Sequence, residues 1–212
     1  QLPNTYQLLP TLLQAQGYTT FNHGKTDYNF VWDSNAYNYN AKSKTDFVDL
    51  VSRQPFFGQI QTKGGKNNTS QFPAERKVDP ASVTVPADYP NNEIYREVVA
   101  QHYDAIRKDD DLIGEILRGL ESAGLAENTI VVYFSDHGAN NLVRHKQMAT
   151  EGGLQVPLII MGPEAWVPQQ QIREDLVDLL DLSATTLAWA GINKPKWCSG
   201  QILFSDDFKA GS

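Results

Sequence analysis

Two runs of strand-forming residues, 129–135 and 156–161, enclose a polar segment and constrain the fold of this chain more than any other feature. Each run is apolar without alternation, which is typical of strands in a parallel sheet that helices cover on both faces. The first run ends in Ser135-Asp136-His137-Gly138, and Glu151-Gly152-Gly153 precedes the second. The pattern predicts two buried strands joined by a polar loop, as in an α/β protein.

Helical and strand patterns alternate through the rest of the chain. We expect helices at 10–16, 44–53, 92–123 and 172–190, further strands at 18–21 and 55–61, and polar loop after 191. Residues 71–91 hold four prolines and no clear period, so an extended connection is predicted there. The alternation predicts an α/β fold with a largely parallel sheet flanked by helices. With 212 residues, no internal repeat and no linker, a single domain is expected.

Composition narrows the classes of function. The formal net charge of −7 argues against nucleic-acid binding as the main function, but it leaves room for a local basic pocket. No apolar run reaches the roughly 18 residues of a membrane span, so no membrane partner is expected. The single cysteine, Cys198, rules out an intrachain disulfide and leaves the redox compartment open. The chain begins with Gln1, so we expect a processed or cut start, and nothing follows about export.

Asp136 and His137 stand where the first apolar run ends, and ligand sites in open α/β sheets lie beyond the carboxyl ends of the strands. Carboxylate oxygen suits a hard divalent cation, and imidazole extends the choice toward transition metals. Both side chains are therefore candidate metal ligands. The spacing alone is equally consistent with a second interpretation, in which Asp136 caps a turn and His137 faces solvent.

Cations recur after the predicted strands: Lys25 after 18–21, Lys63 and Lys66 after 55–61, and Arg144, His145 and Lys146 after 129–135. A short basic cluster is usually a solvated loop. Here, however, lysines follow three predicted strands in a chain whose net charge is negative. This arrangement favours one site in which several cations bind sulfate or phosphate oxygens. Glu151 is a candidate partner for Lys146. His102, inside the long predicted helix, is expected to be structural, and no catalytic role is expected for Cys198.

Several of these segments together resemble the sulfatase family of the alkaline-phosphatase-like superfamily. The matching segments are LLPTLLQAQGYTTFNHGKTDY, QPFFGQIQ, YDAIRKDDDLIGEILRGLESAGLAENTIVVYFSDHG with Asp111 and Gly114, and KQMATEGGLQVPLII. The last two are the most specific, and the resemblance runs through nearly the whole chain. It implies an alkaline-phosphatase-like α/β fold and hydrolysis of sulfuric esters.

The resemblance also implies roles for individual residues. Asp136 and His137 would be metal ligands, with His137 where many sulfatases have Asn and with Ca²⁺ as the first choice of divalent metal. Lys25 and Lys146 would be catalytic residues that contact the sulfate group. Asp27 stands where the family's Gly-Lys-x-His motif has His.

Substrate-binding roles are expected for Lys63 and Arg144. Lys63 stands where many members place a substrate-contacting His, and this departure suggests a subfamily with a different substrate. The Cys/Ser-x-Pro/Ala-x-Arg motif, from which sulfatases make formylglycine, is not found in these 212 residues, and neither is the family's Asp-Asp pair. We therefore expect both in an upstream segment, an incomplete N-terminus, a short or missing C-terminal subdomain, and little turnover by this chain alone.

The expected substrate is a small-molecule or glycan sulfate ester, with sulfated carbohydrates favoured by family analogy. Two alternatives stay open at this point. One is a phosphodiesterase or phosphonate hydrolase of the same superfamily, which an SDHG segment also suits. The other is a non-catalytic, anion-binding relative. Family analogy would place the parent protein in the periplasm or outside the cell, and the sequence leaves the oligomeric state open.

Overall fold

The computed structural model describes residue 3 and residues 5–39 and 46–209. The chain forms two compact units. Unit 1 comprises residues 1–61, 123–130 and 161–212, and unit 2 comprises residues 62–122 and 131–160. Within the described residues, no helix combines the length and the apolar character that a membrane span requires.

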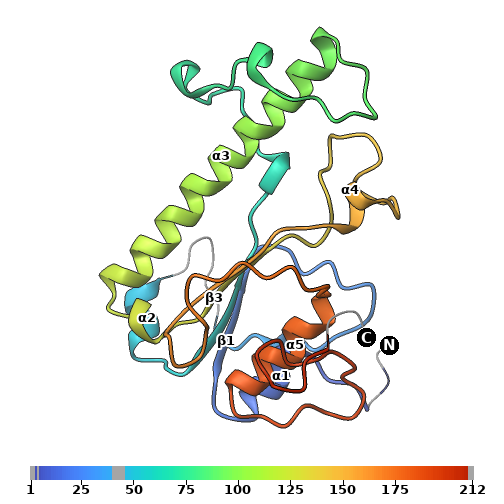
Figure 1. Cartoon of the computed structure of the whole chain (residues 1–212). Helices are drawn as coiled ribbons and strands as arrows, with labels where there is room; N and C mark the ends of the chain where they lie inside the picture. Colours follow the sequence, from blue (N-terminus) through green and yellow to red (C-terminus); the bar gives the residue numbers. More distant parts are fainter. Residues whose placement is uncertain (1–2, 4, 40–45, 210–212) are drawn as a thin grey trace. The chain divides into compact units, whose positions relative to one another are not determined.

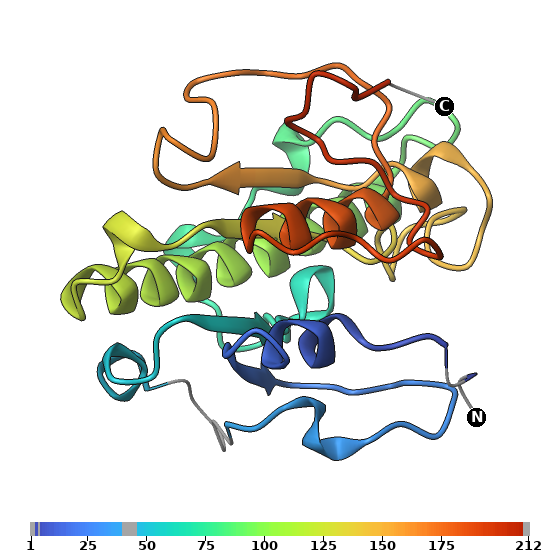
Figure 2. The same cartoon turned by 90° about the horizontal axis from the view of Figure 1, so that it is seen from below.

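Unit 1 is built on two parallel strands, β1 (Thr19–His23) and β2 (Phe56–Ile60), which confirm the strands predicted there. Helix α1 (Leu9–Gln14) lies against β1 and contacts α5 (Leu179–Trp189) (Figure 1 and Figure 2). Pro10 stands in the first turn of α1, where a missing backbone N–H costs no hydrogen bond. The short helix α2 (Phe47–Val51) is capped by Asp46 and confirms the described part of the helix predicted at 44–53; residues 44–45 lie outside the described residues.

The centre of unit 1 depends on a glycine opposite an aromatic ring. Phe21 of β1 is 2% exposed and lies in register with Gly58 of β2. A Cβ at Gly58 would stand 2.0 Å from the Phe21 ring, so only glycine lets the ring cross the neighbouring strand here. The core is completed by further buried side chains: Leu13, Thr20, Ala36, Leu50, Leu125, Val167, Ala184, Thr185, Leu187 and Leu203.

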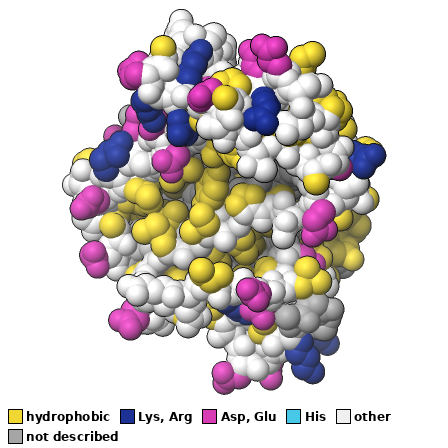
Figure 3. Space-filling model, turned by 45° about the horizontal axis from the view of Figure 1, so that its top comes forward, with side chains coloured by type: hydrophobic (Ala, Val, Ile, Leu, Met, Phe, Trp, Pro, Cys, Tyr) yellow, Lys and Arg dark blue, Asp and Glu magenta, His cyan; other side chains and the backbone are white. Residues whose placement is uncertain are grey.

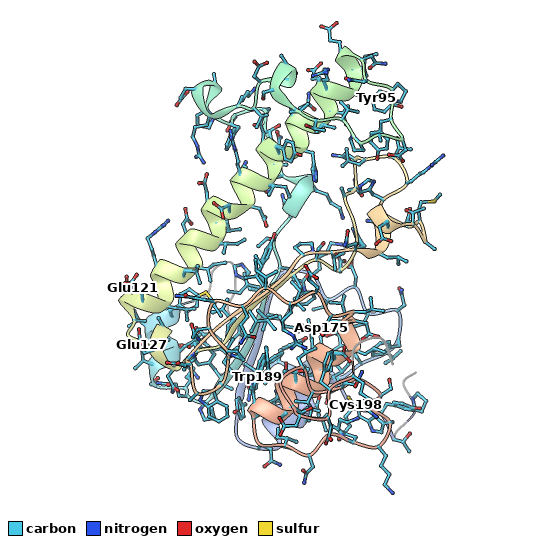
Figure 4. All side chains as sticks on the ribbon, in the orientation of Figure 1. Tyr95, Glu121, Glu127, Asp175, Trp189 and Cys198 are labelled. Carbon is cyan, nitrogen blue, oxygen red and sulfur yellow. The ribbon has the colours of Figure 1, made fainter. Side chains whose placement is uncertain are left out.

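Helix α5 begins at Leu179, so the prediction that it starts at 172 is wrong. Asp178 forms a capping box with Asp181, which fixes the first turn. The preceding Arg173 is held instead by tertiary contacts, since its guanidinium donates to the Leu203 carbonyl at 2.6 Å and lies over the Phe208 ring. At the other end of α5, Trp189, which is labelled in Figure 4, stacks on Phe204 with 5.9 Å between ring centroids.

Unit 2 contains the long helix α3 (Glu93–Ser122), which confirms the helix predicted at 92–123. Short 3₁₀ turns, among them η2 (Gly64–Lys66) and η4 (Pro80–Ser82), pack along α3. The proline-rich connection is thus not wholly extended, because η3 (Ala74–Arg76) and η4 interrupt it. Val83, Val99 and Ala100 form a small apolar core between this connection and the helix.

Strands β3 (Val131–Phe134) and β4 (Leu158–Met161) form a second two-stranded sheet, which confirms both predicted strands. Their predicted burial on both faces is wrong for the described structure. Phe134 is 42% exposed and Ile159 is 59% exposed. Other hydrophobic side chains are also open to solvent on the face drawn in Figure 3. Apolar composition therefore identified the strands but not what covers them.

Candidate functional site

The loop that leaves β3 closes back on itself at α4 (Glu151–Leu154). The backbone N–H of Gly138 donates to the Gly153 carbonyl at 3.0 Å, and that of Lys146 donates to the Ala139 carbonyl at 3.1 Å. A Cβ at Gly138 would stand 1.8 Å from the Gly152 carbonyl oxygen, so the close approach requires glycine. These contacts give residues 135–153 a defined path and place four of the predicted site residues in one loop.

Asp136 and His137 face each other at the start of this loop. His137 Nε2 lies 3.5 Å from Asp136 Oδ1, while the Nδ1–H group donates to the Gly138 carbonyl at 2.8 Å. Since Nδ1 is used as a donor, Nε2 is the ring nitrogen left beside the Asp136 carboxylate. A proton or a cation between the two atoms would favour this approach. A metal-binding His commonly has its other ring nitrogen fixed in this way.

The pair fits part of a divalent-cation site. One carboxylate and one imidazole are two ligands, and the described residues hold no cluster of three or more His, Cys, Asp or Glu side chains arranged for a metal. A cation here would need further oxygen ligands from substrate, water or other parts of the protein. Within the described residues no backbone N–H donates to the Asp136 carboxylate, and its side chain is 81% exposed.

Lys146 and Arg144 lie later in the same loop. Lys146 is partly buried, and within the described residues its ammonium group forms no ion pair. The predicted partner, Glu151, begins helix α4 instead of a tight turn and does not hold Lys146. Arg144 adopts a left-handed backbone conformation with φ of 59° and lies 3.8 Å from Asp88, with both side chains largely exposed. The ammonium group of Lys146 is therefore a candidate anion ligand.

Lys63 stands at the start of η2, on a loop that a buried carboxylate holds in place. Asp109 of α3 is 0% exposed and accepts hydrogen bonds from Thr62 Oγ1 at 2.8 Å, the Gly64 N–H at 3.0 Å and Asn67 Nδ2 at 3.1 Å. Sequence reasoning missed this residue. A signal existed, since Asp109 falls at helical spacing from Ile106 and Ile113, on the apolar stripe of α3.

Two histidines flank these loops within unit 2. His102 confirms its predicted place in α3, and its ring fills the space that a Cβ at Gly65 would occupy. Its Nδ1 is buried without a hydrogen-bond partner in the described structure. Burial first, and the charge of His145 second, lower the pKa of His102. His145 is held by the Tyr89 hydroxyl, 3.1 Å from its Nδ1, which sequence reasoning also missed.

Lys25 belongs to unit 1 and follows β1. Its ammonium group pairs with Asp27 at 2.6 Å, so the residue that replaces the expected His contacts the lysine directly. The loop is tied to the end of β2, because Gln61 Nε2 donates to the Lys25 carbonyl and to Asn22 Oδ1. Lys25 thus follows a strand, as predicted. Cys198 is buried in the C-terminal loop of the same unit (Figure 4).

The sequence matches a known family across most of its length. The family model described as Sulfatase aligns with residues 1–192. The chain belongs to the sulfatase family. Among curated relatives of this sulfatase-family chain, arylsulfatase K of Xenopus laevis is 39% identical over 111 residues, which is 51% of this chain and 20% of that protein. N-sulphoglucosamine sulphohydrolase of Homo sapiens is 30% identical over 148 residues, which is 68% of this chain and 29% of that protein.

Solved structures agree on the fold. A 2-O GAG sulfatase superposes with a TM-score of 0.62 and 23% identity, covering 96% of this chain and 56% of that protein. The predicted fold class, α/β and alkaline-phosphatase-like, is thereby confirmed. The chain spans only 20% and 29% of the two curated sulfatases above, so the activity of a whole protein is a matter of proposal.

Proposed function

We propose that this chain supplies part of the active site of a sulfuric ester hydrolase that acts on a sulfated carbohydrate. The observation that carries the proposal is the closed loop 135–153. It presents the Asp136–His137 pair and the Lys146 ammonium group from one segment, in a chain that belongs to the sulfatase family. Two of the proteins named above, the N-sulphoglucosamine sulphohydrolase and the 2-O GAG sulfatase, carry a sulfated sugar in their names and support a sulfated carbohydrate as the substrate class.

Each residue has a distinct task in this proposal. Asp136 and His137 would hold a divalent cation, with Ca²⁺ the first choice, and the bound cation would polarise sulfate oxygens as a Lewis acid. Lys146 would neutralise the negative charge that the sulfate group carries in the transition state. For Lys25, the family resemblance implies a catalytic role as well. Lys63 and Arg144 would bind the charged groups of the substrate around the ester.

The reacting nucleophile would be a formylglycine, whose motif these 212 residues do not contain, so catalysis is proposed for the complete protein. His137 favours a second candidate. An imidazole ligand widens the choice of metal, and phosphate or phosphonate esters carry the same kind of charge that Lys146 would bind. A non-catalytic, anion-binding relative is the third candidate, because the chain's own residues explain binding but not turnover.

One assay distinguishes the three candidate functions. The protein expressed from its native gene is assayed with 4-nitrophenyl sulfate and with 4-nitrophenyl phosphate under the same conditions. The proposal predicts a higher kcat/KM for the sulfate ester. A higher value for the phosphate ester would favour the second candidate, and no hydrolysis of either ester would favour the third.

A further inference from the structure

Four aromatic side chains gather on the loop that follows Lys25 in unit 1. Tyr28 stacks on Phe30 with 5.3 Å between ring centroids and meets Trp32 edge-on at 5.0 Å. Trp32 in turn meets Tyr37 edge-on at 5.9 Å. The separations lie in the range that aromatic pairs prefer, so the rings form one cluster.

Hydrogen bonds fix this aromatic cluster to the sheet. The hydroxyl groups of Tyr28 and Tyr37 lie 2.8 Å apart, and the Tyr37 hydroxyl donates to Gln59 Oε1 at 2.5 Å. Burial is the main cause of a raised pKa at Tyr37, so its phenol keeps the proton that it donates. Gln59 pairs with Asn22 one position before β1 and β2 end. The cluster is therefore anchored near the carboxyl ends of these strands, where α/β folds bind ligands.

The rings are not part of the core of unit 1. All four side chains are partly exposed, and the neighbouring Val31 is 75% exposed. In the described part of this loop, residues 24–39, the turn η1 (Ser34–Ala36) is the only regular structure. Partly open aromatic rings held rigidly by hydrogen bonds are a common way to build a binding surface, because they offer contact area at a low cost in conformational entropy.

The chemistry beside the rings indicates the kind of ligand. Lys25 and Asp27 form an exposed ion pair immediately before Tyr28 in the chain. The ammonium group can donate to a sulfate, and the carboxylate can accept from hydroxyl groups. Aromatic faces stack on the C–H faces of sugar rings, which are apolar. A sugar ring that carries both hydroxyl and sulfate groups matches this combination.

We propose that Tyr28, Phe30, Trp32 and Tyr37 form a sugar-ring subsite that helps to select the carbohydrate substrate. This inference rests on the proposed function for the identity of the substrate, but its own residues lie outside the loop 135–153. Trp32 contacts two neighbours in the cluster and is the ring whose loss is expected to matter most. Replacement with Phe retains an aromatic face, and replacement with Ala removes it.

The test is a calorimetric binding titration of the 212-residue chain and its variants, with the indole N–H signals in NMR as a second readout for the wild-type protein. The chain has four tryptophans, Trp32, Trp166, Trp189 and Trp197, and the Trp32→Phe variant assigns the Trp32 signal. The probes are a sulfated heparin disaccharide, its desulfated counterpart and inorganic sulfate. The variants are Trp32→Ala, Trp32→Phe and Lys146→Ala, each checked for folding by the dispersion of its remaining signals.

We expect both disaccharides to shift the Trp32 signal selectively, and Trp32→Ala to weaken disaccharide binding about tenfold while inorganic sulfate binds as before. Trp32→Phe should retain most of the affinity. The subsite is overturned if neither disaccharide binds, or if Trp32→Ala leaves their affinity unchanged. Lys146→Ala tests the proposed function separately. Unchanged sulfate binding in that variant, with a clear effect of Trp32→Ala, would contradict the Lys146 site and leave the sugar subsite standing.

Discussion

The carboxylate of Asp109, on α3, accepts a hydrogen bond from the backbone N–H of Gly64 at 3.0 Å. The same carboxylate also binds Thr62 and Asn67, so one buried side chain fixes the loop that carries Lys63. Buried polar groups of this kind are costly to leave unpaired. Asp109 is therefore expected to contribute more to stability than the exposed acidic residues beside it.

Asp109→Ala should lower the free energy of unfolding by about 3 kcal/mol, because it leaves three donors without their acceptor. Asp109→Asn, which keeps the shape and part of the hydrogen bonding, should cost less. Asp111→Ala is the matched control on the same helix. Asp111 pairs with Arg76 in an exposed ion pair, and its loss should cost much less than the loss of Asp109. Urea denaturation measures all three, and equal losses for Asp109→Ala and Asp111→Ala would contradict the assignment.

Gly138→Ala should destabilise the closed loop 135–153 by about 2 kcal/mol or more, since its Cβ would overlap the Gly152 carbonyl oxygen. The change should also displace His137, its neighbour. Gly114→Ala in α3 is the control, because its Cβ would meet only the flexible end of Arg118 and alanine favours helix. Chemical denaturation of the two variants gives the comparison. A Gly138→Ala protein as stable as wild type would show that the loop does not close as described.

Stability should depend on pH through His102. Burial lowers its pKa in the folded state below the ordinary value of 6.5, so the unfolded state binds the proton more readily. The contribution of this group to stability is present above that value and decreases as the pH falls from 6.5 toward the lowered pKa of the folded state. The thermal midpoint of wild type should thus fall more steeply between pH 7.5 and 5.5 than that of His102→Gln. Parallel profiles would mean that His102 is not buried in its neutral form.

Ca²⁺ binding should require Asp136 and His137 together. Removing either ligand from a site of few ligands should weaken the affinity at least about tenfold, because the remaining groups cannot replace the lost donor. Asp136→Ala and His137→Ala are compared with Asp206→Ala, an exposed acidic residue of unit 1, by calorimetric titration of the protein expressed from its native gene. If Ca²⁺ binds all of them equally, the two residues do not form the metal site.

Periodicity was enough to predict the elements that carry their own start and stop signals. Helix α1 ends before Gly17, which has φ of 86°, and α3 ends before Gly124, which has φ of 69°. The start of α5 was not predictable in the same way. Arg173 fits a helical pattern, but its contacts with Leu203 and Phe208, distant in sequence, keep it out of the helix. Local preference cannot reveal such contacts.

The candidate site, like the secondary structure, was predictable from the sequence in part. The positions of Asp136, His137 and Lys146 after a strand follow from the sequence, and the structure places them in one loop. The supporting residues were not predicted, since Asp109 and Tyr89 act through contacts across the fold. The exposure of Ile159 shows a further limit, because an apolar residue in a strand indicates a preference for burial and not the element that would provide it.

The loop carrying Lys146 is proposed to act on a sulfate ester. The most direct measurement is the release of inorganic sulfate from a sulfated heparin disaccharide by the protein expressed from its native gene, with Lys146→Ala compared with wild type. Lys196→Ala, at an exposed lysine of unit 1, is the control. We predict that Lys146→Ala lowers kcat/KM by about 100-fold or more, as the loss of a group that stabilises transition-state charge does, while Lys196→Ala has no effect. If Lys146→Ala releases sulfate with the same kcat/KM as wild type, the proposed role of Lys146 is contradicted.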